Sequence, residues 1–313
     1  MRTGQTVRAT APASIGNLAV GFDVLGLAFD AARDTVVAHR SDAQGARLGD
    51  VTGLVSSLPA AVEQNCALAA AQAVLDAARA DFGVVLDIDK GVPLSAGMGG
   101  SAASAVAAAG AVNALLPEPF DNETLLPLAM EGERVSADPP PWDNVMASLY
   151  GGLVLAARLD PPLIRPLPLP QGLSCLLWHP DRKIETQAAR DLLAETVALH
   201  TAVEHARNMA SFIAACHSGD LDLFGSGLRD ILIEPQRLPL LPELAALQAA
   251  ALEAGALGCS FSGSGPSVFA LMPDARFEAV RAAMQHVFDA EQLTATSYTA
   301  PLVSAGLKVE PVQ

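Results

Sequence analysis

The sequence predicts an α+β protein of two domains. Its 313 residues suffice for two domains of ordinary size, and 51% hydrophobic with 17% charged residues is the composition of a folded chain. Short segments that alternate apolar and polar residues, as strands do, are interspersed with longer Ala-rich segments that predict helices. Five prolines within residues 160–170 interrupt both patterns. We therefore expect an N-terminal domain of residues 1–165 and a C-terminal domain of residues 166–313.

The first half combines strands with Ala-rich helices. The expected strands are residues 6–9, 35–39, 84–89 and 151–156. The expected helices are residues 59–82, 101–116 and 121–136, the last with Asp121 as its N-cap and with Glu131 and Glu133 on an acidic face. Residues 11–28 are apolar but interrupted by glycines, Asn17 and Asp23, which predicts a loop. Three prolines within residues 138–144 predict a stiff turn.

The second half follows the order β-α-α-β-α-β, which is typical of a ferredoxin-like layer. The expected helices are residues 186–193, 201–218, 222–233, 243–254 and 277–288. The expected strands are residues 173–178 and 294–299, together with the end of a glycine-rich segment at residues 258–270.

The net charge of −15 constrains the partner. A surface of that sign repels nucleic acids and anionic membranes, so we expect neither and predict a small-molecule partner. With only three lysines, the positive groups at an anion site must come from arginines, helix ends or a metal ion. No apolar run reaches about 18 residues, so we expect a cytoplasmic protein. Four widely spaced cysteines predict free thiols and no zinc site.

The segment PLSAGMGGSAASA, residues 93–105, predicts a phosphate-binding loop. Gly97, Gly99 and Gly100 allow the backbone to curl with its N–H groups pointing inward. A helix then begins at or beside Ser101, and the unpaired N–H groups and positive dipole end of a helix N-terminus favour anions.

Two known nucleotide-binding patterns fit this segment poorly. A P-loop requires a Gly-Lys pair, and the chain has none. A dinucleotide-binding pattern matches Gly97, Gly99 and Ala102, but that loop should follow a buried strand directly, whereas residues 84–89 alternate like a half-exposed strand. A nicotinamide-dependent oxidoreductase is therefore kept only as an alternative.

Three segments in the order ASIGNLAVGFDVLGLA, PLSAGMGGSAASA and GCSFSGSGPSVFAL resemble the three motifs of the GHMP small-molecule kinases, and the first is most similar to that of the homoserine kinases. The resemblance implies a ribosomal-protein-like α+β N-terminal domain and a ferredoxin-like C-terminal domain. It also implies ATP- and Mg²⁺-dependent phosphorylation of the L-homoserine hydroxyl to O-phospho-L-homoserine, a step of threonine biosynthesis. Family members are often dimers, so a homodimer is expected.

The resemblance assigns the nucleotide and metal residues. Asn65 would bind the adenine, and Ser101 and Glu133 would hold Mg²⁺ and act in catalysis. The residues that would wrap the phosphates are Pro93, Gly97, Met98, Gly99, Gly100, Ser101 and Ala102.

It also assigns the substrate residues, which are Asn17, Asp23, Asp143, Asn144, Thr186, Arg190 and Arg237, with Arg190 acting in catalysis as well. The residue types suit an amino acid, because a zwitterion needs an anion, here Asp23, held apart from cations, here Arg190 and Arg237. Arginine binds carboxylates in a bidentate manner. Gly263, Ser264 and Gly265 would support the site from the second domain.

The chain departs from the family pattern at two positions. Gly100 stands where the family has a serine, and Pro141 stands where it has the histidine of a His-Pro-Asp-Asn motif. A lost hydrogen bond to a charged ligand costs about 1.5–3 kcal/mol. Two alternatives follow: another GHMP kinase that acts on a related hydroxylated substrate, or a nucleotide-binding homologue with impaired catalysis.

Overall fold

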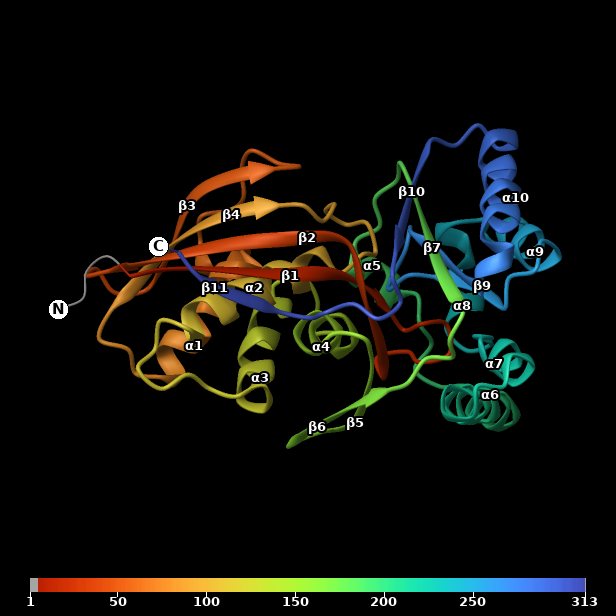
Figure 1. Ribbon diagram of the computed structural model, residues 1–313, viewed down its shortest axis with the longest axis horizontal. Helices are drawn as coiled ribbons and strands as arrows, with labels where there is room; N and C mark the ends of the chain where they lie inside the picture. Colours follow the sequence, from red (N-terminus) through yellow and green to blue (C-terminus); the bar gives the residue numbers. More distant parts are fainter. Residues whose placement is uncertain (1–4, 313) are drawn as a thin grey trace.

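The computed structural model describes residues 5–312, which form two β-sheets side by side, each with its own helices (Figure 1). The first sheet has seven strands in the order β11-β1-β2-β4-β3, with β5 paired to β2 and β6 paired to β5. Only β3 and β4 pair in parallel; the other pairs are antiparallel. Its strands are β1 (Thr6–Gly16), β2 (Leu25–Ser41), β3 (Ala46–Gly53), β4 (Gly83–Lys90), β5 (Leu153–Leu159), β6 (Pro162–Leu167) and β11 (Lys308–Pro311).

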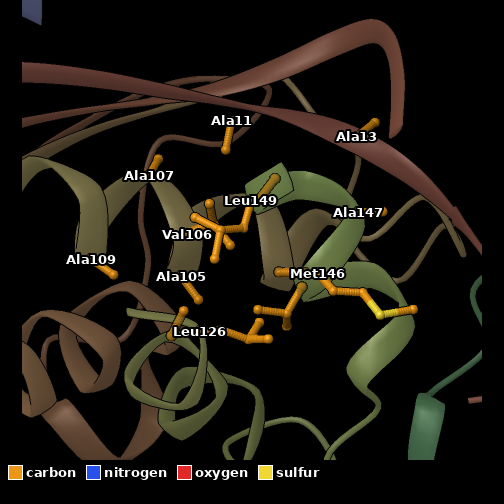
Figure 2. Close-up of a cluster of buried hydrophobic side chains, with 14 of the residues drawn as sticks. Ala11, Ala13, Ala105, Val106, Ala107, Ala109, Leu126, Met146, Ala147 and Leu149 are labelled. Atoms are coloured by element: carbon orange, nitrogen blue, oxygen red, sulfur yellow. The ribbon is translucent and has the colours of Figure 1, made fainter. Parts of the chain in front are cut away.

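Four helices pack against one side of this sheet (Figure 1): α1 (Cys66–Ala77), α2 (Gly100–Asn113), α3 (Asn122–Glu133) and α4 (Trp142–Tyr150). Every residue of α2 except Ser101 is buried, since the helix contacts the sheet and all three other helices. Figure 2 shows side chains of β1, α2, α3 and α4 gathered in this core, many of them alanines. Small residues allow close approach: a Cβ added at Gly132 would lie 2.5 Å from the carbonyl oxygen of Cys66.

The second sheet has four antiparallel strands, β7 (Leu173–Pro180), β8 (Gly258–Phe261), β9 (Val268–Pro273) and β10 (Ala295–Ala300). Their order, β10-β7-β9-β8, is that of a ferredoxin-like sheet, which confirms the expected fold class. The helices of this half are α5 (Thr186–Asp191), α6 (Leu199–Ser218), α7 (Leu221–Gly227), α8 (Glu234–Arg237), α9 (Leu244–Glu253) and α10 (Phe277–Ala290). Trp178 and Phe288 belong to a separate apolar core beneath α9 and α10.

Several helices end earlier than predicted, and two of them are much shorter. The helix expected at residues 59–82 begins only at Cys66, because Asn65 is its N-cap and accepts hydrogen bonds from the N–H groups of Ala67 and Leu68. The helix expected at residues 222–233 ends at Gly227. The carboxylate of Asp230 accepts the N–H groups of residues 232–234, and such side-chain acceptors compete with helical hydrogen bonds.

Other elements extend beyond the predictions. β1 continues through Gly16 and β2 begins at Leu25, so the loop expected over residues 11–28 spans only residues 17–24. The turn predicted at residues 138–144 ends earlier, because α4 begins at Trp142. The strands β3, β6, β8 and β11 and the short helix α8 were not predicted as separate elements. The expected N-cap at Asp121 is confirmed, with its carboxylate 2.9 Å from Thr124 N, and the four cysteines are free thiols.

The course of the chain between the sheets bears on the expected domain boundary. The proline-rich segment contains β6, so the first sheet extends to Leu167. After β10 the chain returns to the first sheet, where β11 pairs with β1 (Figure 1). We expected these two strands to belong to different domains. Within residues 5–312, no helix has both the length and the apolarity needed to span a bilayer.

The sheet topology also tests the alternative of a dinucleotide-binding fold. The strand that leads into the glycine loop, β4, pairs antiparallel with β2. A dinucleotide-binding fold needs a mostly parallel sheet at this point. The nicotinamide-dependent oxidoreductase alternative is therefore wrong.

Candidate active site

A cavity of about 500 Å³ is lined by residues of both halves of the chain. The predicted site residues line it with four exceptions: Pro93, Met98, Ala102 and the supporting Gly265. Met98 and Ala102 point into the core, with 1% and 0% of their surfaces exposed, so they offer a ligand only backbone atoms.

The glycine loop forms one wall of the cavity and leads into α2. The N-cap of this helix is Gly99, with a left-handed φ of 67°, and the helix begins at Gly100 beside the predicted Ser101. Among residues 5–312, no acceptor takes a hydrogen bond from the N–H groups of residues 97–101. Five donors at a helix N-terminus are an anion-binding arrangement.

Gly97 brings the loop against the second glycine-rich segment. Its φ is +72°, and an added Cβ would lie 2.5 Å from the carbonyl oxygen of Ser262. The hydroxyl of Ser262 donates a 2.6 Å hydrogen bond to the carbonyl of Gly97. Only glycine fits at this position, so the contact between the two halves depends on it.

A buried ion pair lies beneath the loop. The ammonium group of Lys90 pairs with Asp34 and also donates to Gly100 O and to Ser104 Oγ, both at 2.9 Å. Asp34 in turn accepts the N–H groups of Gly91 and Val92. This network ties the end of β4 to the first turn of α2. This network was not predicted from the sequence, although Lys90 stands close before the loop.

Glu133 ends α3 within the cavity lining and is only 2% exposed. Burial raises the pKa of its carboxyl group to about 7, against the opposing effects of Ser101, Ser136 and Lys90. Its Oε1 is buried without a hydrogen-bond partner among the described residues. An unpaired carboxylate oxygen next to a serine hydroxyl is a donor set that suits Mg²⁺.

Asn65 lies at another part of the cavity wall and is 5% exposed. Besides capping α1, its amide group donates a 2.8 Å hydrogen bond to the carbonyl of Pro59. The side-chain oxygen therefore already has two donors, and one N–H of the amide is left for a ligand.

The loop of residues 17–24 carries Asn17 and Asp23, both in left-handed backbone conformations with φ of 67° and 56°. Asn17 holds the loop in place, since its side chain accepts from Asp23 N and donates to Gly263 O at 2.9 Å. Arg190 Nη2 lies 2.8 and 2.9 Å from the two carboxylate oxygens of Asp23. The expectation that Asp23 and Arg190 are held apart is therefore wrong.

Arg237 is 3% exposed and lies on the same side of the cavity as Arg190. It donates to the carbonyl oxygens of Gly263, at 3.0 Å, and Ala189, at 3.4 Å. Burial and then the charge of Arg190 lower its pKa. Phe22, which was not predicted as a site residue, places the centroid of its ring within 5.5 Å of both guanidinium carbons.

Asp143 and Asn144 lie in the first turn of α4, next to the glycine loop. Asp143 is 1% exposed, and burial followed by the charge of Asp23 raises its pKa. Asn144 Oδ1 accepts a 2.9 Å hydrogen bond from Ser14. Pro141, which precedes α4, and Thr186, which begins α5, also line the cavity.

An anion-binding loop, a buried carboxylate with a free oxygen and a cluster of one acid and two arginines share a single cavity. With a ferredoxin-like second half, this fold and site define a small-molecule phosphotransferase. Models of the GHMP kinases N terminal domain and of the GHMP kinases C terminal domain match residues 65–152 and 212–290. The chain belongs to the GHMP kinases and, within them, to the homoserine kinase family.

Full-length relatives support this assignment. The chain is 42% identical to the homoserine kinase of Xylella fastidiosa (strain 9a5c) over 96% of its own length and 93% of that protein. It is 36% identical to the homoserine kinase of Chlorobium phaeobacteroides (strain BS1), over 97% and 99%. The crystal structure of homoserine kinase from Cytophaga hutchinsonii superposes with a TM-score of 0.91 at 37% identity, covering 97% of each chain. Mevalonate diphosphate decarboxylase from Staphylococcus aureus shares the fold, with a TM-score of 0.73 at 16% identity.

Proposed function

We propose that this protein transfers the γ-phosphoryl group of ATP to the side-chain hydroxyl of L-homoserine, giving O-phospho-L-homoserine and ADP in threonine biosynthesis. One observation carries the proposal: Asp23, Arg190 and Arg237 line the same cavity as Gly97, Gly99, Gly100 and Ser101, whose N–H groups have no acceptor among residues 5–312. The loop suits a polyphosphate, and the three charged side chains suit the two charges of an amino acid.

At the nucleotide end, the N–H groups of the loop hold the phosphates and the remaining amide N–H of Asn65 contacts the adenine. Met98 and Ala102 contribute through the backbone only. Ser101 and Glu133 are the residues that would hold Mg²⁺, which when bound neutralises phosphate charge. The buried, unpartnered Oε1 of Glu133 supports this role.

At the substrate end, Asp23 takes the ammonium group of homoserine, and Arg237 takes the carboxylate. Asn17 fixes the loop that presents Asp23. Arg190 bridges the two ends: Nη2 pairs with Asp23, and Nη1, which has no acceptor among residues 5–312, stabilises charge on the transferred group. Asp143, Asn144 and Thr186 complete the wall around the hydroxyl-bearing chain.

A coupled ADP-release assay tests the proposal, run with Mg-ATP and a panel of homoserine, serine, threonine, mevalonate and galactose. We expect homoserine to give the highest kcat/KM, with O-phosphohomoserine detected by ³¹P NMR. Faster turnover of another alcohol would support the alternative that Pro141 raises, a GHMP kinase for a related substrate. Calorimetry that shows ATP binding with no turnover of any alcohol would support the alternative that Gly100 raises, a homologue with impaired catalysis.

The assembly and location of the protein are also proposals. Its family leads us to propose a homodimer, which light scattering would test, since a mass of 32.2 kDa corresponds to one chain. We also propose a cytoplasmic location, which fractionation of cells that express the protein would test.

A further inference from the structure

Phe22 lies beside Asp23 in the loop of residues 17–24, and its ring is part of the cavity wall. The guanidinium carbon of Arg190 lies 5.5 Å from the ring centroid, and that of Arg237 lies 5.3 Å from it. Both distances are within the range of cation–π attraction. One aromatic ring therefore contacts both cations of the substrate end.

The ring of Phe22 offsets the repulsion between the guanidinium groups of Arg190 and Arg237. The charge of Arg190 opposes that of Arg237, and burial already disfavours a charged Arg237. Asp23 neutralises Arg190 directly. Among residues 5–312 the hydrogen bonds of Arg237 go only to the neutral carbonyls of Gly263 and Ala189, and the charges of Asp143, Asp23 and Asp230 offset the repulsion in part. A π face attracts both guanidinium groups without adding a negative charge that would repel a carboxylate ligand.

The donors left free point to the same ligand. Arg190 keeps a buried Nε without a partner among residues 5–312, and Arg237 Nη2 has no acceptor there either. A pair of guanidinium groups with free donors binds a planar carboxylate well, provided that both are held in a fixed orientation.

We propose that Phe22 is a positioning residue for carboxylate recognition: its ring holds Arg190 and Arg237 together so that both face the carboxylate of the amino-acid substrate. Phe22 does not touch the reacting atoms. It sets the preference of the site for an amino acid over an amino alcohol. The inference rests on the proposed homoserine kinase activity.

The test compares homoserine with 3-aminopropan-1-ol, which has the same hydroxyl and amine but no carboxylate. In Phe22→Leu, we expect the KM for homoserine to rise about tenfold, because the variant loses two cation–π contacts at a site that is shielded from water. The inhibition constant of 3-aminopropan-1-ol and the KM for ATP should stay within about twofold of the wild type. Phe22→Tyr retains the ring and should keep the wild-type KM.

Phe120→Leu is the matched control, because it makes the same change at a half-buried phenylalanine outside the cavity. If Phe22→Leu does not fold, Phe22→Met replaces it. Equal weakening of homoserine and 3-aminopropan-1-ol would show a packing role and overturn the inference, as would an unchanged KM for homoserine. A wild-type protein that does not phosphorylate homoserine would instead refute the proposed function, so the two failures are distinguishable.

Discussion

Arg190 and Asp23, 167 residues apart in the chain, form an ion pair in which one guanidinium nitrogen contacts both carboxylate oxygens. The pair is partly buried, with 13% of the Arg190 side chain and 31% of the Asp23 side chain exposed. An ammonium group that binds to Asp23 must therefore share the carboxylate with Arg190. Binding of the substrate and the orientation of Arg190 are linked through these two oxygens.

Asp23→Asn tests this link. The amide keeps the shape of the side chain but loses its charge, so we expect the KM for homoserine to rise about 10- to 100-fold, as for a lost charged hydrogen bond. The KM for ATP should change little, and steady-state kinetics with each substrate varied would measure both. Asp30→Asn is the control, since Asp30 pairs with Arg33 outside the cavity. An equal rise in both KM values would contradict the role of Asp23.

Glu133 gives the protein a defined pH dependence. Its pKa of about 7 lies above the 4.5 of the unfolded chain, so folding takes up a proton between these values. The neutral carboxyl group contributes free energy of unfolding that is fully present below pH 4.5 and is lost as the pH rises through about 7. Without nucleotide or Mg²⁺, urea unfolding should show Glu133→Gln gaining stability relative to wild type between pH 5 and pH 8, by about 3 kcal/mol at most.

Added Mg²⁺ should reduce this difference at pH 8, because the cation stabilises the ionised carboxylate. Asp143, whose pKa is also raised, contributes in the same direction in both proteins and so cancels in the comparison. A parallel pH profile for wild type and Glu133→Gln would show that Glu133 does not titrate in this range.

Lys90→Met tests the buried pair beneath the glycine loop. It leaves the carboxylate of Asp34 buried without its cation, which typically costs about 3–5 kcal/mol of unfolding free energy. The double variant Lys90→Met/Asp34→Asn removes both charges and should recover more than half of this loss. Urea unfolding of both single variants and the double variant would give the coupling energy. Additive losses would show that the two charges do not depend on each other.

Gly97→Ala tests the contact between the two glycine-rich segments. The new Cβ would lie 2.5 Å from Ser262 O, so we expect kcat/KM to fall by at least tenfold and the protein to be destabilised. Gly172→Ala is a close control: its φ of +73° matches the +72° of Gly97, but nothing lies within 4 Å of an added Cβ. Backbone strain affects both variants, so a loss confined to Gly97→Ala isolates the contact. Equal effects would mean that strain alone matters.

The glycine loop and the helix behind it were predictable because their determinants are local. Gly97, Gly99 and Ser101 stand in one short segment, and the structure begins α2 within one residue of the predicted start. The ferredoxin-like half was likewise predictable from the order of its segments. Each of these features depends on residues that are close in sequence.

Features that depend on distant residues were not predictable in the same way. Asp34 and Lys90 meet because β2 pairs with β4 with Thr35 opposite Asp89, and no local pattern specifies that register. The pairing of Arg190 with Asp23 depends on how the two halves pack. The loop after α7 depends on the carboxylate of Asp230, which a helical pattern of apolar residues does not reveal.

The return of β11 to the first sheet means that two connections join the halves, residues 168–172 and residues 301–307. A domain joined by one linker can rotate about any axis, whereas a domain joined by two linkers rotates about the axis that passes through both. We therefore expect any hinge motion between the sheets to have a single degree of freedom. Any such motion would move Arg237 relative to Asp23 along a single arc.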